Sequence, residues 1–448
     1  MNLTRTKMGR RQEAQDYSEA DIISNLPRDV IHEIWERLPL QDAARMSVLS
    51  HKWQDIWTST PHLLFDDCFF TSVLKEERQE TLRFCSTVSK ILFQHQGPIH
   101  KFSLFVPPLN ACPDVSQWIS HLSRNGLRDF SLRNTYMSPL KLSSRLFCCG
   151  DLEKLKLFFC IFSPPPLNIR GFPKLTSLEL DRVFLTYKTF KDLIESCPVL
   201  HNLNLTNFTG MEHRNIVIDS PNLKHLILDW QFESLELKSC ENLVSASFGM
   251  QIFVNVVHRA SLCNLVKVLA TSSKLKRLCF KGHFCTILFK AGSLRINFEK
   301  LKILELLNLH LEYLDDFSSV ISCIQSSPNI EVLKITVLSS TNLADHVLDY
   351  NPECKLHHLS CAKVGIMTAS STELKLIEFL LTCSPTLEKL SVHTPLKNKS
   401  RSRMLMQLNR FRRASPKVEV ICPESILPKR SVHVATSPST SGSSSDSD

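Results

Sequence analysis

The sequence predicts an α/β fold made of three parts. A short three-helix unit is followed by a curved solenoid with one strand plus a helix or loop per repeat, and a cap closes the C-terminal end. Two observations predict this fold: a leucine pattern recurs through most of the 448 residues, and a compact helical pattern of a different kind precedes it. The composition, 43% apolar and 22% charged, is ordinary for a globular protein.

The recurring pattern is Leu-x-x-Leu-x-Leu or a close substitute, between about residue 100 and residue 393. Successive copies start 20 to 32 residues apart, which spans the period of leucine-rich repeats. One such unit cannot bury its apolar side alone, so the units must stack. The copies are Leu127-Phe130-Leu132, Leu152-Leu155-Leu157, Leu175-Leu178-Leu180, Leu200-Leu203-Leu205, Leu223-Leu226-Leu228, a weaker Leu243-Ala246-Phe248, Leu275-Leu278-Phe280, Leu301-Leu304-Leu306, Ile330-Leu333-Ile335, Leu356-Leu359-Cys361 and Leu387-Leu390-Val392.

Proline supports this register, because it cannot continue a helix and so separates each returning segment from the next strand. It stands two residues before the first Leu or Ile in five copies, and short helices are expected before Pro198 and Pro328. Residues 208–274 fit the pattern least well. There, Ile216-Val217-Ile218 and Phe232-Leu235-Leu237 predict extra strands in variant repeats, and a break in the solenoid is the rival interpretation.

The N-terminal helical unit lies in residues 24–66. Pro27 suits the first turn of a helix, Pro39 ends that helix, and Asp42 is placed to cap a second one. A third apolar stripe follows at helical spacing. The unit is small for one stable core, so we expect packing against a partner to stabilise it. The third stripe consists of Leu49, Trp53, Ile56 and Trp57.

The order of these residues resembles the F-box. The match runs through Leu26-Pro27, Val30-Ile31, Ile34, Leu38-Pro39, Asp42-Ala43-Ala44-Arg45, Ser47, Leu49-Ser50, Trp53, Trp57 and Pro61. The resemblance implies docking onto the Skp-type adaptor of a cullin–RING ubiquitin ligase. The expected adaptor contacts are Leu26, Pro27, Val30, Ile31, Ile34, Leu38 and Pro39, whereas Trp53 and Trp57 are expected inside the junction with the first repeats. The alternative is an ordinary helical cap on the domain that follows.

The C-terminal part resembles the FBD module of many plant F-box proteins with leucine-rich repeats. ELKLIEFLLTCSPTLEKLSV, from Glu373, matches its first half, and LNRFRRASPKVEVI, from Leu408, matches its second. A helix from Leu405 to Phe411 and a closing strand at Val418 to Ile421 are expected. The domains predicted are a disordered stretch at 1–20, an F-box at 21–66, the solenoid at 67–370, an FBD-like module at 371–423 and a disordered Ser-rich tail at 424–448.

The target of such a protein is expected on the solvent side of the strands, where residues interleave with the buried leucines. These residues are charged and of mixed sign, with basic ones ahead, which favours a protein or peptide partner with acidic features. The alternative is a merely soluble surface. The candidates are Arg133, Lys156, Glu179, Asp229, Arg277, Lys281, Glu305 and Lys334.

Enzymatic motifs are absent from the sequence: it has no glycine-rich phosphate loop, no G-x-S-x-G and no H-E-x-x-H. Cys354, His357, His358 and Cys361 have metal-like spacing, but in a strand they alternate between faces instead of converging. We therefore expect a non-catalytic subunit with no metal site and no cofactor. No stretch suits a membrane span and the N-terminus is no secretory signal, so nucleus and/or cytoplasm is the expected location.

The formal net charge of +9 is concentrated near the C-terminus. Residues 397–417 hold eight Lys and Arg and no Asp or Glu, which suits an importin-type receptor, nucleic acid or simply solvent. Nucleic acid is disfavoured because aromatic side chains do not interleave with the basic ones. Two functions remain: the substrate-recognition subunit of a Skp–cullin–F-box ligase for an unknown target protein, or a leucine-rich-repeat scaffold outside any ligase.

Overall fold

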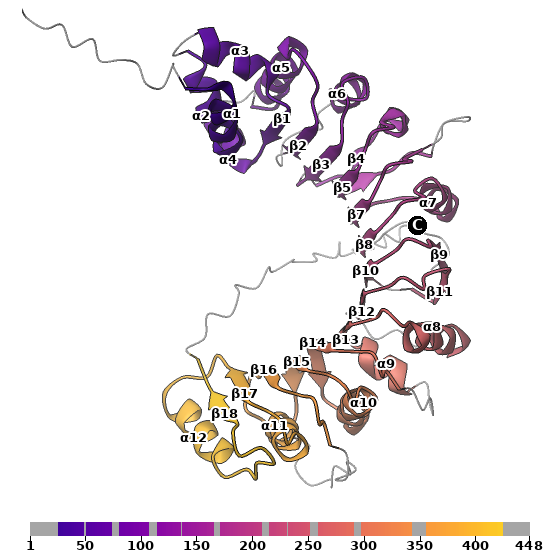
Figure 1. Ribbon diagram of the computed structural model, residues 1–448, viewed down its shortest axis with the longest axis vertical. Coiled ribbons are helices and arrows are strands. Elements are labelled where there is room, and N and C mark those ends of the chain that lie inside the picture. The colour runs from indigo at the N-terminus through magenta and orange to yellow at the C-terminus, as the bar shows by residue number, and fades with distance from the viewer. Residues whose placement is uncertain are drawn as a thin grey trace, which may run out of the picture. The chain divides into compact units, whose positions relative to one another are not determined.

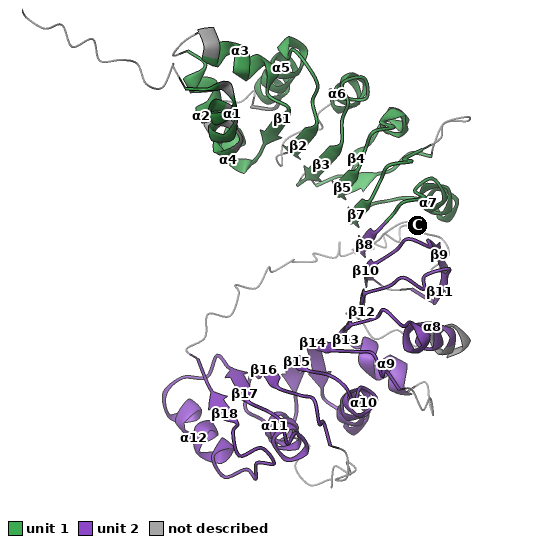
Figure 2. Cartoon of the chain, viewed as in Figure 1, with its two compact units in different colours: residues 1–200, 208–212 green, residues 201–207, 213–448 purple. Residues whose placement is uncertain are grey.

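The protein is described from a computed structural model. It describes residues 26–48, 51–73, 80–106, 114–135, 137–164, 171–207, 215–230, 232–250, 259–290, 297–342 and 355–423. The predicted disordered termini and Cys354 lie outside these residues. The chain divides into two compact units, residues 1–200 with 208–212 and residues 201–207 with 213–448 (Figure 2).

The first unit begins with the three helices that the sequence predicts. They are α1 (Arg28–Arg37), α2 (Leu40–Met46) and α3 (His51–Ser59), followed by strand β1 (His62–Phe65). Pro27 directly precedes α1, and Pro39 separates α1 from α2, since neither proline can donate a helical hydrogen bond. The prediction that Asp42 caps the second helix is wrong. Pro39 occupies the N-cap position of α2, and Asp42 lies inside its first turn, where it pairs with Arg45 at 3.1 Å.

A parallel sheet forms the remainder of the first unit, in the strand order β1-β2-β3-β5-β7. Its further strands are β2 (Lys101–Val106), β3 (Asp129–Asn134), β5 (Lys154–Phe158) and β7 (Ser177–Asp181), and β4 (Leu140–Lys141) pairs separately with β6 (Cys160–Ile161). The helical segments are α4 (Asp67–Val73), α5 (Glu80–Gln94), α6 (Val115–Leu122), the 3₁₀ turn η1 (Ser144–Cys148) and α7 (Tyr187–Glu195). Because β1 pairs in parallel with β2, the sheet starts directly after the three-helix unit.

The second unit contains a parallel sheet in the order β8-β10-β12-β13-β14-β15-β16-β17-β18. These strands are β8 (Asn202–Thr206), β10 (His225–Asp229), β12 (Ser245–Met250), β13 (Arg277–Gly282), β14 (Ile303–Leu311), β15 (Val332–Ser340), β16 (Cys361–Gly365), β17 (Lys389–His393) and β18 (Glu419–Ile421). Its helices are α8 (Arg259–Thr271), α9 (Phe284–Lys290), α10 (Leu314–Gln325), α11 (Ser371–Cys383) and α12 (Asn398–Leu408). The helices α8 to α11 cover one face of this sheet (Figure 1).

The leucine pattern marks the buried side of these strands. In β5, Leu155 and Leu157 are 1% exposed while Lys154 and Lys156 face solvent, and the same alternation recurs along both sheets. Strand pairing places each pattern residue beside its counterpart in the next repeat, for example Leu203 beside Leu226. Burying these rows drives the stacking of the repeats. The predicted fold, a leucine-rich-repeat solenoid after a three-helix unit, is therefore confirmed.

The irregular region 208–274 contains a second, small sheet. β9 (Asn215–Asp219) pairs in parallel with β11 (Ser234–Lys238), and neither strand joins the main sheet of the second unit. Both were expected as extra strands, and they occupy the returning segments of two repeats. In these repeats a strand therefore replaces the returning helix, and β8, β10 and β12 pair without a break.

The C-terminal helix differs from its predicted bounds. α12 spans Asn398–Leu408, whereas Leu405 to Phe411 was expected. Met404 and Leu408 are each 1% exposed and form the buried side of the helix, one turn apart. The helix ends at Leu408, and the chain turns directly after it. The closing strand β18 pairs with β17, in agreement with the sequence.

Candidate functional site

The F-box-like unit has its own small core, and this core decides which side chains can meet a partner. Ile31, Ala43, Trp53 and Ile56 form it, and each is at most 4% exposed. Leu26, Leu38, Met46 and Trp57 pack against it from the outside. Trp53 is thus an internal residue of the helical unit itself, not of a junction with the repeats.

Ile31 must be removed from the expected adaptor contacts. Its side chain is fully buried in this core, so it has no surface to offer a partner. The adjacent Val30 is 42% exposed, and Ile34, one turn later on α1, is half-buried. Pro27 and Pro39 are exposed as well. An apolar surface at Pro27, Val30 and Ile34 is therefore left over after the unit has built its core.

Two more residues of this unit differ from what the sequence indicated about the adaptor surface. Leu38 lines a cavity of about 130 Å³ together with His62 and Leu64 of β1, so its free side meets the start of the sheet. Val48 follows α2 and is 85% exposed. Helical spacing alone would include Val48 in the second helix, because the sequence does not show that α2 ends at Met46. Val48 is the apolar candidate that sequence reasoning missed.

The second candidate surface is the solvent face of the strands in each unit. All eight predicted target residues lie on these strands, but Glu305 is buried there, and most of the eight are already paired. In the first unit Lys156 meets Glu179 at 2.9 Å. The Arg133 guanidinium lies 5.5 Å from the centre of the Phe158 ring, as does that of Arg182.

In the second unit, two further ion pairs cross between strands. Arg277 donates to one Glu305 oxygen through two nitrogens, at 2.8 and 3.2 Å. Lys281 meets Asp229 at 3.2 Å although β12 lies between their strands. The strand between them carries Gly249 at this point, and a Cβ there would lie 2.2 Å from an Asp229 carboxylate oxygen. Gly249 thus leaves room for the Asp229 carboxylate.

These pairs weaken the argument that the strand face attracts an acidic partner. Six of the eight predicted residues neutralise one another, and for Lys334 no ion pair is found within the described residues. A partner that bound these cations would have to displace their carboxylates. Charge sign alone, read from the sequence, therefore overstates how basic this surface is.

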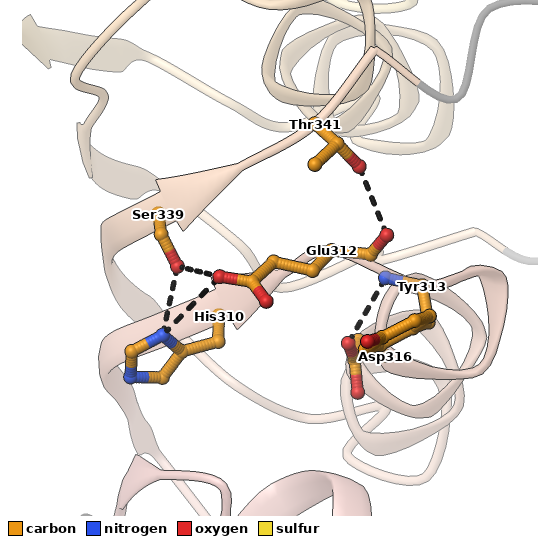
Figure 3. Close-up of polar contacts among 6 residues, drawn as sticks. All are labelled: His310, Glu312, Tyr313, Asp316, Ser339 and Thr341. Carbon is orange, nitrogen blue, oxygen red and sulfur yellow. Dashed lines mark hydrogen bonds and ion pairs between the residues drawn. The ribbon is translucent and has the colours of Figure 1, made fainter.

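A polar cluster also joins neighbouring repeats at the ends of β14 and β15 (Figure 3). The Ser339 hydroxyl donates to Glu312 at 2.7 Å and lies 2.7 Å from His310 Nδ1, which itself is 4.0 Å from Glu312. The same ring nitrogen faces both Ser339 and Glu312. A relay that activates serine needs the acid and the hydroxyl at opposite nitrogens of the ring.

The cluster is therefore a clamp between repeats. The Thr341 hydroxyl donates to the Glu312 carbonyl at 2.9 Å, and Asp316 accepts from the Tyr313 amide at 3.1 Å at the start of α10 (Figure 3). Within the described part of the chain, no three His, Cys, Asp or Glu side chains group so as to hold a metal ion. No described helix is long and apolar enough to cross a membrane.

Most described cysteines are buried free thiols. Burial raises the pKa of Cys149 and Cys197 to about 12, which keeps these thiols protonated and unreactive at neutral pH. Cys85 on α5 departs from this pattern and is disulfide-bonded.

Comparisons with known proteins agree with this architecture. The F-box domain family matches residues 23–64, and a family described as "FBD-associated F-box protein At5g56370, LRR repeats" matches residues 115–252. The Arabidopsis thaliana "F-box/FBD/LRR-repeat protein At1g13570" is 32% identical over 90% of this chain and 98% of its own length. The "Putative F-box/FBD/LRR-repeat protein At4g13965" of the same plant is 27% identical over 91% and 98%.

A third Arabidopsis thaliana relative, "F-box/FBD/LRR-repeat protein At2g04230", is 27% identical over 77% of this chain and 82% of its own length. The similarity thus extends through the F-box, the repeats and the C-terminal region together, in the order that the structure displays. An F-box domain implies binding to a Skp-type adaptor in general, and proteins with F-box and leucine-rich repeats are generally non-catalytic adaptors. The chain belongs to the plant F-box/FBD/leucine-rich-repeat protein family.

Proposed function

We propose that this protein is the substrate-recognition subunit of a Skp–cullin–F-box ubiquitin ligase. The F-box docks the Skp-type adaptor, and the leucine-rich repeats bind a target protein for ubiquitination. The observation that carries the proposal is the apolar surface of α1: Val30 and Ile34 remain exposed or half-buried although the unit has a complete core of its own. The subunit itself would supply no reacting group, and it would act by raising the effective concentration of the target near the ligase.

The proposed adaptor contacts are revised from those the sequence suggested. Pro27, Val30, Ile34 and Pro39 would make the direct contacts, with Val48 as an addition, and Leu26 would support them from the edge of the core. Ile31 would act only by holding α1 in place. The proposed location is nucleus and/or cytoplasm, where such ligases meet their targets.

The test is co-purification of the full chain with a Skp-type adaptor. Burying one valine contributes about 1.5–3 kcal/mol, so Val30→Asp should weaken adaptor binding by at least about tenfold. Leu82→Asp is the matched control, because Leu82 is an apolar residue on α5 that is 68% exposed. Equal adaptor recovery with Val30→Asp and the wild type, or no recovery with either, would contradict the proposal. In that case the scaffold outside any ligase remains the better explanation.

A further inference from the structure

The C-terminal cap carries a strongly basic surface that the adaptor and the target repeats leave unused. It consists of α12 and the turn after it, and we call it the cap surface. Within residues 397–417 the eight cations stand without a single Asp or Glu. They are Lys397, Lys399, Arg401, Arg403, Arg410, Arg412, Arg413 and Lys417.

These cations differ from those on the strand face in having no carboxylate partner among the residues that the structure describes. Among the described residues, none of the eight forms an ion pair. Seven are exposed; Arg401 is half-buried and donates to the Cys422 carbonyl instead. Arg413 donates to the Asn409 side chain at 3.4 Å, and this neutral partner leaves its charge without a counter-charge in the described part of the chain. The positive charge of the cap surface is therefore available to a ligand.

The surface is also held in a fixed shape. Met404 and Leu408 are each 1% exposed and fasten α12, and the Ala414 amide donates to the Leu381 carbonyl of α11 at 2.8 Å. About half of the segment is helical, since α12 spans Asn398–Leu408. Ordered cations lose less side-chain and backbone entropy when they bind than cations on a flexible tail do.

One side of α12 combines charge with an apolar contact. Lys399, Arg403 and Met406 recur at helical spacing on α12, and Arg410 lies in the turn directly after it; Met406 is 62% exposed among these cations. An adaptable thioether suits an apolar side chain of a partner and has no role beside a row of phosphates. The only aromatic residue of the segment, Phe411, is half-buried, so bases have no stacking platform.

We propose that the cap surface is a second docking site, which binds an acidic, amphipathic segment of a protein partner. Carboxylates of the segment meet Lys399, Arg403 and Arg410, and an apolar residue of the segment packs on Met406. Recognition of acidic motifs by clusters of basic side chains is a recurring mode of peptide binding. The site lies in the C-terminal module and is independent of the F-box, so it can be tested whether or not the ligase role holds.

The experiment measures binding of a fluorescent peptide of repeated Glu-Glu-Leu-Glu units to the full chain, by anisotropy at low and high salt. The charge-reversed variant Lys399→Glu/Arg403→Glu/Arg410→Glu should bind at least about tenfold more weakly. A control variant with the same net charge should stay within about twofold of wild type. That control is Lys154→Glu/Lys224→Glu/Lys267→Glu, three exposed lysines elsewhere on the molecule.

Met406→Ala should weaken binding of this peptide and leave binding of a poly-Glu peptide without leucine unchanged. Circular dichroism and thermal unfolding verify that each variant folds as the wild type does. Three outcomes overturn the proposal: no peptide binding at low salt, equal loss in the charge-matched control, or tighter binding of duplex or single-stranded nucleic acid than of the acidic peptide at equal salt.

Discussion

Glu373 at the start of α11 allows a sharp test of what holds the C-terminal module together. Its carboxylate is fully buried and accepts four hydrogen bonds. One oxygen accepts from the Met367 amide at 3.0 Å, and the other accepts from the Thr368 amide and hydroxyl at 3.2 Å each and from the Ser370 amide at 3.0 Å. Because Ser370 in turn caps α11 with its side chain, the loop before the helix is built around this one carboxylate.

Glu373→Gln replaces one oxygen by an NH₂ group of nearly equal size. The amide oxygen can keep the three donors at one position, but the NH₂ then faces the Met367 amide, and two donors cannot bond. A hydrogen bond to a charged group is worth about 1.5–3 kcal/mol, and the remaining three bonds become neutral and weaker. We expect the loop to lose about 2–4 kcal/mol of stability, although the shape of the side chain is conserved.

The assay is hydrogen–deuterium exchange of residues 367–370 in the full chain. A loss of about 2 kcal/mol or more should speed exchange by about 30-fold or more, because these amides exchange through local opening. Glu378→Gln is the control: it makes the same change one helix turn later on α11, at a half-exposed carboxylate. Unchanged exchange in Glu373→Gln, or the same acceleration in Glu378→Gln, would show that the Glu373 charge does not hold this loop.

Three further predictions address other parts of the molecule. Ile31→Ala should destabilise the F-box by about 2–5 kcal/mol while Val30→Ala stays within about 0.5 kcal/mol, which urea unfolding of the two variants compares directly. Gly249→Ala should reduce the free energy of unfolding by less than about 1 kcal/mol, because the Asp229 carboxylate can rotate away from the new Cβ. That rotation breaks the ion pair between Asp229 and Lys281, so we expect faster acetylation of Lys281 at an unchanged melting temperature. Burial raises the pKa of the Cys149, Cys197 and Cys240 thiols in the folded chain, whereas thiols of the unfolded chain ionise near pH 9. The free energy of unfolding should therefore be unaffected by these thiols below pH 9 and should fall above it, by about 1 kcal/mol per buried thiol at pH 10. A urea unfolding midpoint that is equal at pH 8 and pH 10 would contradict this prediction.

The strands could be predicted from the sequence because their signal is local. Leu155 and Leu157 are two residues apart, and burial of one face requires this alternation in every repeat. The same holds for the returning strands at Ile216 and Leu235, whose apolar alternation was visible before their pairing was known. What the pattern did not show was that β9 and β11 pair with each other instead of joining the main sheet.

The surface could be predicted far less well, because it depends on residues that are distant in sequence. Asp229 and Lys281 are 52 positions apart and meet only because β10, β12 and β13 align in register around Gly249. On α1, Ile31 and Val30 are adjacent apolar residues, and the helical pattern alone does not show which of them is buried in the core. Only the positions of Ala43 and Trp53 decide that Ile31 is inside.

The distribution of counter-charges, rather than the net charge, decides where an acidic partner would bind this protein. On the strand face, a carboxylate from outside must replace Glu179, Asp229 or Glu305 at a cation that is already satisfied, so the exchange gains little. On the cap surface, no carboxylate of the described residues has to be displaced, and each new ion pair adds to the last. The strand face is therefore suited to select a partner by shape and by matched charge. The cap surface is suited to attract an acidic partner over distances up to the Debye length, which is about 8 Å at physiological salt. If both surfaces serve one target, raising the salt concentration should weaken its capture through the cap much more than its fit to the strands.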